Sequence, residues 1–328
     1  MISQLKRFIK SFCLLEFLDT GFHIFEHKLK DKYYSENNEL IPLKETQIVF
    51  MVDGRHTHGG LTDRLRAITT IYHYCKLKGI RFYIHFVYPF DLSLFLEPNI
   101  YDWSIKPKEI SYNSKQATPA IIFDWHFNAI FHKPYLNKSV SKNKGKQIHI
   151  YSNSNFYKEY YSQDFKELFK LSPILTNRIK LEQEYTKTPY VAMVFRFQQL
   201  LGDFKEANYK ILPEEEKQIL IENCINKVKE IHDKYSYKAI LVTSDSISFL
   251  KYISNELPYV HIISGRMVHM DYTKEEEDKD VYMKSFIDMI MLSKAEKIYL
   301  LKTGDMYHSG FAKYAAMLNN KPYEEILF

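Results

Sequence analysis

The chain has 328 residues, of which 45% are apolar and 26% are charged. This length and apolar content are enough for two α/β domains with buried cores. The formal net charge of +5 is small for the size, and no lysine block is long enough to line a nucleic-acid groove, so we expect no nucleic-acid partner.

Cysteine usage and hydropathy argue against disulfide-bonded, zinc-binding and membrane-spanning classes of protein. Cys13, Cys75 and Cys224 are widely spaced and odd in number, which indicates neither a disulfide framework nor a zinc site. We therefore expect a reducing cytoplasm. The sequence contains no apolar run of about 18 residues, the length that a spanning helix needs.

The first 18 residues combine apolar and basic side chains at helical spacing. The apolar positions are Leu5, Phe8, Phe12 and Leu15, interleaved with Lys6, Arg7 and Lys10. The pattern favours an ordinary packing helix. The alternative is a short amphipathic helix that makes peripheral contact with the inner membrane.

Apolar runs and helical patterns alternate along the first half. Residues 47–52 form a β-like run, residues 61–75 carry a helical apolar stripe, and residues 81–87 form a second β-like run. This order predicts a βαβ unit. Further along we expect strands at 120–123 and 147–151, an exposed loop over the lysine-rich segment 138–146, and helix between 157 and 185.

The alternation resumes with an apolar run at 190–195. After it we expect helices at 213–234, 246–255, 281–293 and 309–318, and strands at 238–243, 260–264 and 297–301. Short strands joined by helices predict a parallel sheet covered on both faces. Ligands of such sheets bind beyond the carboxyl ends of the strands.

The strand at 47–52 leads into a turn that contains two glycines and several basic side chains. Gly59 and Gly60 precede the helix at 61–75, and backbone N–H groups at a helix start bind anions. The basic residues of the turn are Arg55, His56, His58, Arg64 and Arg66. We expect a ligand that carries phosphate or carboxylate, with a plain tight turn as the alternative.

Four features in fixed order resemble the fucosyltransferases that use GDP-L-fucose, notably the α1,6-type, rhizobial and protein O-fucosyl enzymes. They are the glycine turn at 58–65, the strand end at 194–203 with its arginine, the strand and turn at 241–246, and the segment at 288–295 that precedes a strand and residues 303–312. The resemblance implies a GT-B architecture, with two facing Rossmann-like domains and a cleft between them. It implies an N-terminal acceptor-side domain over residues 1–165 and a C-terminal donor domain over 166–328, the last helix packing back on the first domain.

The resemblance also implies roles for individual residues. Arg196 is expected to contact the β-phosphate, because guanidinium binds phosphate oxygens in a planar fork. Asp288 is expected to accept from the guanine edge, with a buried structural ion pair as the alternative. Asp245 is expected to contact the nucleoside or to cap the following helix. Ser309 is expected to cap the last helix, to hold phosphate, or both.

The complete expected donor site has no metal and no cofactor. Its residues are His58, Gly59, Gly60, Arg64, Arg196, Ser244, Asp245, Asp288, Thr303, Ser309 and Gly310. Asp203 is the expected general base, with Glu206 behind it, because an inverting transfer deprotonates the acceptor hydroxyl. His56 and His58 are alternative bases or phosphate ligands.

Two positions depart from the family pattern. Related enzymes often carry a histidine two residues before the arginine and a second basic residue after it, whereas this chain has Val194 and Phe197. Lys302 or His308 is expected to replace the missing charge.

The resemblance implies a bacterial-type, metal-independent inverting glycosyltransferase. It would move L-fucose from GDP-fucose to a saccharide or lipid-linked saccharide acceptor in surface-polysaccharide assembly. The alternatives are a transferase for another GDP-sugar such as a heptose, a non-catalytic nucleotide- or sugar-binding module, and another phosphate-binding α/β enzyme. A P-loop kinase is disfavoured, because no G-x-x-x-x-G-K-[ST] loop is present.

Overall fold

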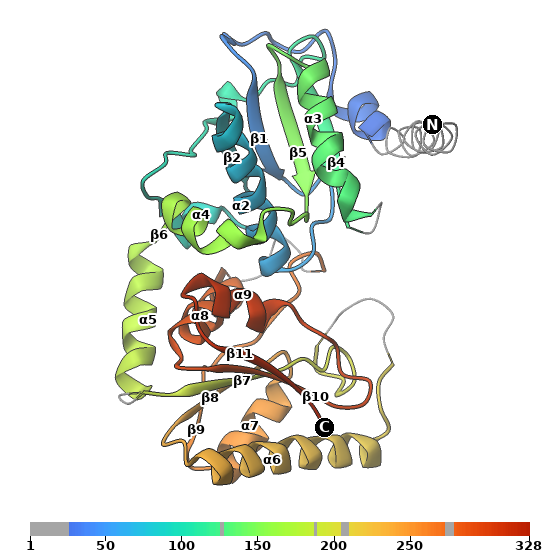
Figure 1. Ribbon diagram of the computed structural model, residues 1–328. Helices are drawn as coiled ribbons and strands as arrows, with labels where there is room; N and C mark the ends of the chain where they lie inside the picture. Colours follow the sequence, from blue (N-terminus) through green and yellow to red (C-terminus); the bar gives the residue numbers. More distant parts are fainter. Residues whose placement is uncertain (1–25, 125–127, 187–188, 205–209, 273–278) are drawn as a thin grey trace, which may run out of the picture. The chain divides into compact units, whose positions relative to one another are not determined.

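The computed structural model describes residues 26–124, 128–186, 189–204, 210–272 and 279–328. The chain folds into two compact α/β units (Figure 1). Unit 1 contains residues 1–58, 63–88 and 101–160, and unit 2 contains residues 59–62, 89–100 and 161–328. Each unit has its own parallel sheet and is described separately below.

The sheet of unit 1 has four parallel strands in the order β2-β1-β5-β4. The strands are β1 (Gln47–Val52), β2 (Arg81–Phe86), β4 (Ala117–Ile122) and β5 (Gln147–Ser152). Nearly every residue of β1, β4 and β5 is buried, which is typical of parallel strands covered on both faces. The strands predicted at 47–52, 81–87, 120–123 and 147–151 are confirmed.

Helix α2 (Leu61–Lys78) connects β1 to β2. Its apolar stripe, including Leu65, Ile68 and Cys75, is fully buried. Because β1 and β2 pair in parallel through this helix, the predicted βαβ unit is confirmed. Residues 26–33 are also helical.

The prediction of an exposed loop over residues 138–146 is wrong in its first half. Helix α3 (His132–Lys142) occupies this stretch, and only residues 143–146 form the turn before β5. Buried His132 and Leu136 anchor the helix one turn apart, and its polar residues face outward. Two anchoring residues are too few to produce a periodic apolar signal.

The sheet of unit 2 has five parallel strands in the order β11-β10-β7-β8-β9. The strands are β7 (Val191–Phe195), β8 (Ile240–Ser244), β9 (Val260–Ile262), β10 (Ile298–Lys302) and β11 (Tyr323–Leu327). The helices are α6 (Glu214–Tyr235), α7 (Ile247–Glu256), α8 (Lys279–Lys294) and α9 (Phe311–Leu318). All of these except β11 were predicted from the sequence.

Helices cover both faces of this sheet (Figure 1). On one face, α6 and α7 contribute Val228, Phe249 and Ile253 to a core that also contains Met193 and Val242. Helices α8 and α9 lie on the other face (Figure 1). The second unit is therefore a three-layer α/β sandwich, as the alternating pattern indicates.

The segment between the two large sheets is less uniformly helical than predicted. Helices α4 (Tyr161–Leu168) and α5 (Pro173–Thr186) are separated by β6 (Phe169–Leu171), which pairs antiparallel with β3 (Leu96–Pro98). Short 3₁₀ turns occur at Leu92–Leu94, Pro107–Glu109, Ala129–Phe131 and Lys158–Tyr160.

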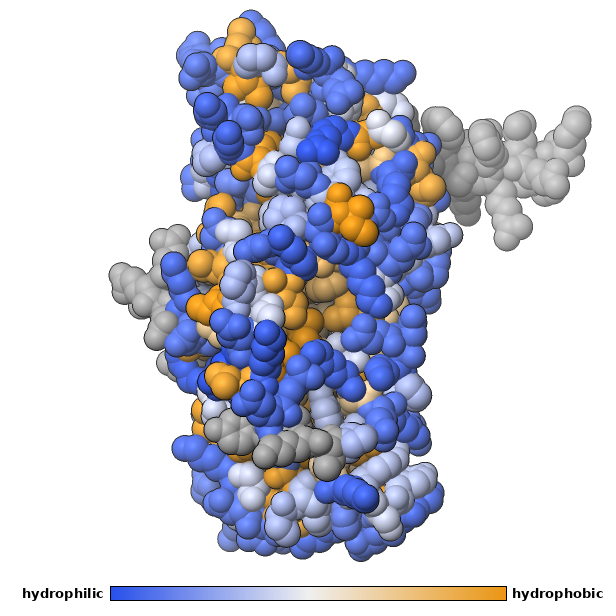
Figure 2. All heavy atoms as spheres, turned by 90° about the vertical axis from the view of Figure 1, so that its left-hand side faces the viewer, coloured by the Kyte–Doolittle hydropathy of each residue, from blue (hydrophilic) through white to orange (hydrophobic). Residues whose placement is uncertain are grey.

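Helix α5 exposes two apolar side chains, Ile174 and Leu181. On the side of the molecule that carries α5, apolar groups alternate with polar side chains (Figure 2). Within the described ranges, no helix combines the length and apolarity needed to cross a membrane. The predicted N-terminal amphipathic segment and Cys13 lie outside the described residues.

Candidate active site

The carboxyl ends of β7 and β8 bring together two residues that are far apart in the sequence. Phe195 and Ser244 are the last residues of these strands and pair in their parallel register. Arg196 follows Phe195 directly, and Asp245 follows Ser244 directly. Nη1 of Arg196 lies 2.9 Å from Oδ2 of Asp245. The edge of the sheet where ligands of α/β proteins bind therefore carries a paired guanidinium and carboxylate.

Asp245 is a buried anchor. Its carboxylate accepts from the backbone N–H groups of Phe197 at 2.9 Å and Gln198 at 2.7 Å. Burial raises the pKa of Asp245 above its ordinary value, and Arg196 and these N–H groups oppose that rise. The carboxylate thus fixes both the arginine and the loop that follows it.

Arg196 keeps part of its side chain accessible. Its side chain is 17% exposed and stacks against the ring of Phe204 at 4.4 Å from the ring centroid. The backbone N–H of Tyr307 donates to the carbonyl oxygen of Arg196 at 3.0 Å. This bond brings the loop after β10 alongside Arg196.

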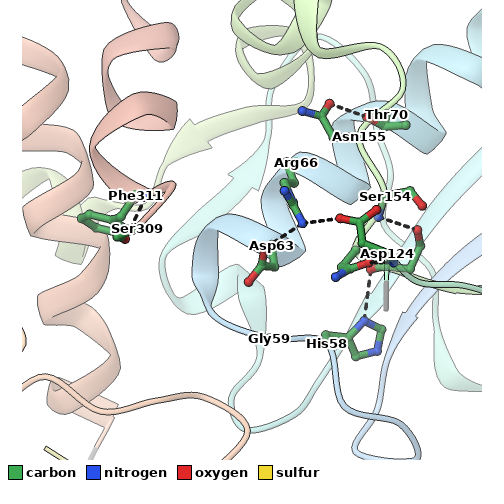
Figure 3. Close-up of polar contacts among 12 residues, drawn as sticks. His58, Gly59, Asp63, Arg66, Thr70, Asp124, Ser154, Asn155, Ser309 and Phe311 are labelled. Carbon is green, nitrogen blue, oxygen red and sulfur yellow. Dashed lines mark hydrogen bonds and ion pairs between the residues drawn. The ribbon is translucent and has the colours of Figure 1, made fainter. Parts of the chain in front are cut away.

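The loop between β10 and α9 contains the remaining expected phosphate ligands. The hydroxyl of Thr303 donates to the carbonyl oxygen of Phe328. The hydroxyl of Ser309, one residue before the N-cap position, accepts from the N–H of Phe311 at 3.2 Å (Figure 3). Gly310 is the N-cap residue of α9. Phosphate binding by these residues remains a prediction.

Asp203, the expected general base, lies in the loop after β7, and its side chain contacts the N-terminal end of α7. Its Oδ2 accepts three hydrogen bonds, from the hydroxyls of Ser246 (3.0 Å) and Ser248 (2.9 Å) and from the N–H of Ser248 (2.8 Å). The residue is exposed, and its Oδ1 has no hydrogen-bond partner in the part of the chain that the structure describes. One carboxylate oxygen is therefore anchored in a residue that is accessible to solvent. Glu206 lies outside the described residues.

Asp288 is fully buried in α8 and forms an ion pair. Both carboxylate oxygens accept from Nζ of Lys284, at 2.6 and 2.5 Å. Burial raises the pKa of Asp288, and Lys284 opposes the rise. This is the structural ion pair that the sequence left as the alternative. Guanine recognition by Asp288 remains a prediction.

The glycine turn requires glycine at only one of its two positions. Gly59 has a φ of 86°, and its N–H donates to the carboxylate of Asp271 at 2.5 Å. Gly60 has an ordinary φ, and a Cβ atom there would meet nothing within 4 Å. The backbone N–H of Gly59 is thus already bonded to a carboxylate.

His58 and Arg64 are buried within unit 1. Nδ1 of His58 lies 3.4 Å from the carbonyl oxygen of Ser152 (Figure 3). Burial lowers the pKa of His58 well below its ordinary range, and the nearby charge of Arg64 adds to this effect, so the imidazole is neutral at pH 7. Arg64 donates to the carbonyl oxygen of Tyr88 at 2.9 Å.

The other arginines of the turn also have partners inside unit 1. Arg66 pairs with Asp63 at 3.0 Å and Asp124 at 2.8 Å (Figure 3). The guanidinium of Arg55 lies between the rings of Tyr33 and Tyr112 and pairs with Asp53. His56 stacks on the ring of Phe123. These contacts give the cations of the turn structural roles, and ligand binding by them remains a prediction.

Arg196, Ser244, Asp245 and Asp203 thus form one connected cluster in unit 2. The hydroxyl of Ser244 lies 3.3 Å from Oδ1 of Asp245 and accepts from the N–H of Ser246. Sequence reasoning missed the partners Gln198, Ser246, Ser248 and Lys284. Only Lys284 had a sequence signal, its i,i+4 spacing from a buried acid. Among the described residues, no group of three or more His, Cys, Asp or Glu side chains is arranged to hold a metal ion.

Comparison with known proteins identifies the fold. No protein-family model matches the sequence, and no curated protein sequence matches it. The solved structure of NodZ alpha-1,6-fucosyltransferase soaked with GDP-fucose is similar, with 13% identity, a TM-score of 0.54, and coverage of 83% of this chain and 92% of that one. The fucosyltransferase NodZ from Bradyrhizobium gives 13% identity, a TM-score of 0.53, and coverage of 84% and 94%.

A plant protein shows the same likeness over more of this chain. Arabidopsis thaliana FUT1 in complex with GDP gives 12% identity and a TM-score of 0.54, with 94% of this chain and 78% of that one covered. The chain therefore has a GT-B-like α/β fold. Its structural neighbours are fucosyltransferases, in agreement with the resemblance seen in the sequence.

Proposed function

We propose that this protein is an inverting glycosyltransferase that transfers L-fucose from GDP-fucose to a saccharide acceptor. The observation that carries the proposal is the Arg196–Asp245 pair, 2.9 Å apart at the carboxyl ends of two adjacent strands of unit 2. It is supported by the likeness of the fold to NodZ, whose structure was determined after soaking with GDP-fucose. Neither support depends on the other.

The chemistry of the donor explains the role of the arginine. A sugar nucleotide leaves as a diphosphate, so negative charge develops on the phosphate oxygens as the glycosidic bond breaks. A guanidinium held in place by a buried carboxylate stabilises that charge without reorganising. In this proposal Arg196 supplies the positive charge, Asp245 positions the guanidinium, and no metal or cofactor takes part.

Asp203 is the proposed base for the acceptor hydroxyl. Three hydrogen bonds hold its Oδ2, and the residue is exposed, so an acceptor can approach the carboxylate. Deprotonation by a positioned carboxylate is the usual route to an inverting displacement. A saccharide or lipid-linked saccharide acceptor of surface-polysaccharide assembly is the acceptor class that we propose, with action in the bacterial cytoplasm or at the inner membrane.

A second candidate is a nucleotide-sugar-binding module without catalysis. It is favoured by the same three hydrogen bonds, because an aspartate that serves only as a cap for α7 needs no further role. A transferase for another GDP-sugar, such as a heptose, would use the same donor site.

Release of GDP from GDP-fucose, with water taking the fucosyl group where no saccharide acceptor is added, tests the proposal. The wild-type protein should release GDP, and Arg196→Ala should lower the rate at least about a hundredfold, the usual effect of removing one donor from a developing oxyanion. Arg178→Ala is the matched control, because this arginine pairs with Glu182 on α5 and should leave the rate unchanged. An unchanged rate in Arg196→Ala would overturn the proposal. Binding of GDP by a wild-type protein that does not cleave GDP-fucose would favour the binding module.

A further inference from the structure

Gln198 has a backbone conformation that is unusual for its residue type. Its φ angle is 53°, in the left-handed region that favours glycine. It lies in the loop after β7, two positions beyond Arg196. Residues with a Cβ atom hold this conformation where surrounding contacts enforce it, and such residues concentrate at binding and catalytic sites.

Asp245 provides the enforcing contacts. Its Oδ2 accepts from the N–H of Gln198 at 2.7 Å, and the same oxygen lies 2.9 Å from Nη1 of Arg196. Its Oδ1 accepts from the N–H of Phe197 at 2.9 Å. One carboxylate therefore fixes the Gln198 backbone and the Arg196 guanidinium in a common geometry.

The side chain of Gln198 is the second unusual feature. The residue is only 5% exposed, and its Nε2 is buried with no hydrogen-bond partner among the described residues. Burying an amide NH₂ group without an acceptor is unfavourable.

Thr243 lies on β8, two residues before Asp245, and also has a buried hydroxyl without a partner in the described part of the chain. Because side chains alternate along a strand, Thr243 and Asp245 lie on one face of the sheet.

We propose that the carboxamide of Gln198 donates to the diphosphate of the sugar-nucleotide donor, together with Arg196. This inference rests on the proposed function and adds a residue to the same donor site. A diphosphate presents more acceptor oxygens than one guanidinium fork can bind. The backbone N–H groups of Phe197 and Gln198 are taken by Asp245, so the side chain of Gln198 is the donor left to this pair of residues.

The carboxamide of Gln198 would contact the diphosphate and not the nucleoside, so the test compares GDP with guanosine. We expect Gln198→Gly to lower the affinity for GDP about tenfold, as for loss of a hydrogen bond to a charged group, and to leave guanosine affinity unchanged. The thermal midpoint should stay equal or rise, because glycine adopts the left-handed conformation without strain. A loss of affinity in a variant that is no less stable cannot come from misfolding.

Charge reversal provides a second variant and its control. Gln198→Glu places a carboxylate of the same shape beside the phosphates and should lower GDP affinity further than Gln198→Gly. Gln199→Glu makes the same charge change at the next, partly buried residue and should retain GDP affinity. Titration calorimetry measures all of these affinities.

The outcomes distinguish this inference from the proposed function. Equal GDP affinity in wild type and Gln198→Gly would overturn the inference alone, as would equal losses for GDP and guanosine. If the wild type binds UDP or ADP in place of GDP, the proposed function fails, and the same comparison with that diphosphate and its nucleoside still decides the role of Gln198. If it binds no nucleoside diphosphate, both fail.

Discussion

Arg196 and Asp245 form an ion pair at the ends of adjacent parallel strands, with Nη1 and Oδ2 2.9 Å apart and the carboxylate side chain 1% exposed. The same carboxylate accepts from two backbone N–H groups of the loop that follows Arg196. Asp245 therefore stabilises unit 2 and also fixes the position of the Arg196 guanidinium.

Breaking this pair should destabilise the protein. We expect Asp245→Asn to lower the free energy of unfolding by about 3 kcal/mol, because it leaves the Arg196 charge without its buried partner. Denaturant unfolding measures the change. Lys170→Ala, which removes an exposed ion pair with Glu97, is the control and should cost less than about 1 kcal/mol. A loss of similar size in both variants would contradict the role given to Asp245.

Asp203→Asn tests the proposed base. Transfer should fall at least about a hundredfold, while GDP affinity is retained and the free energy of unfolding drops by about 1 kcal/mol, as for a weakened helix cap. Ser248→Ala removes a hydroxyl that bonds Asp203 but leaves the carboxylate, so it should retain most of the turnover. Normal transfer by Asp203→Asn would show that this aspartate only caps α7.

Lys284 and Asp288 should behave as a buried ion pair. Asp288→Asn leaves the Lys284 charge buried and should lower the free energy of unfolding by about 3 kcal/mol. The double variant Lys284→Met with Asp288→Leu should recover most of this loss, because apolar side chains replace both charges.

The same double variant tests guanine recognition. If Asp288 also binds the guanine base, the double variant should lose the preference for GDP over ADP, measured as a ratio of dissociation constants. Retention of that preference in the stable double variant would restrict Asp288 to its structural role.

Unit 1 should lose stability in mild acid through His149. This histidine is fully buried, with Nδ1 on the hydroxyl of Tyr34 and Nε2 on the amide oxygen of Gln147. Burial lowers its pKa from 6.5 to about 3, and the charges of Arg55 and His85 add to the shift. Between these values the unfolded state binds more protons than the folded state, so stability falls as the pH falls.

The expected size is roughly 2 to 3 kcal/mol between pH 6.5 and about pH 4.5. His149→Gln should show a shallower fall when unfolding is measured by urea at both pH values. His308→Gln replaces an exposed histidine and should keep the wild-type dependence. An identical slope in His149→Gln and wild type would contradict this assignment.

The regular part of the fold could be predicted from the sequence because its strands are apolar and its helices periodic. Strand β11 was missed because it lies at the edge of its sheet, and Glu324 and Glu325 are exposed within it. The β3–β6 pair was missed because strands of three residues carry too little pattern.

The site was predictable in part, for a different reason. Strand ends located Arg196 and Asp245, but their pairing depends on the parallel register of β7 and β8, which no local pattern encodes. The left-handed conformation of Gln198 could not be predicted from the sequence either, because the carboxylate of Asp245, distant in sequence, imposes it. The cations near the glycine turn were conspicuous in the sequence, and the structure gives Arg55, Arg64 and Arg66 intramolecular partners.

The most direct test of the donor assignment is the thermal midpoint of the wild-type protein with GDP, GDP-fucose, UDP or ADP. A ligand that binds only the folded state stabilises it by about 2.7 kcal/mol at a concentration a hundredfold above its dissociation constant. The account predicts that GDP and GDP-fucose raise the midpoint by several degrees and that UDP and ADP do not. A response to UDP or ADP alone, or to none of the four, would contradict it.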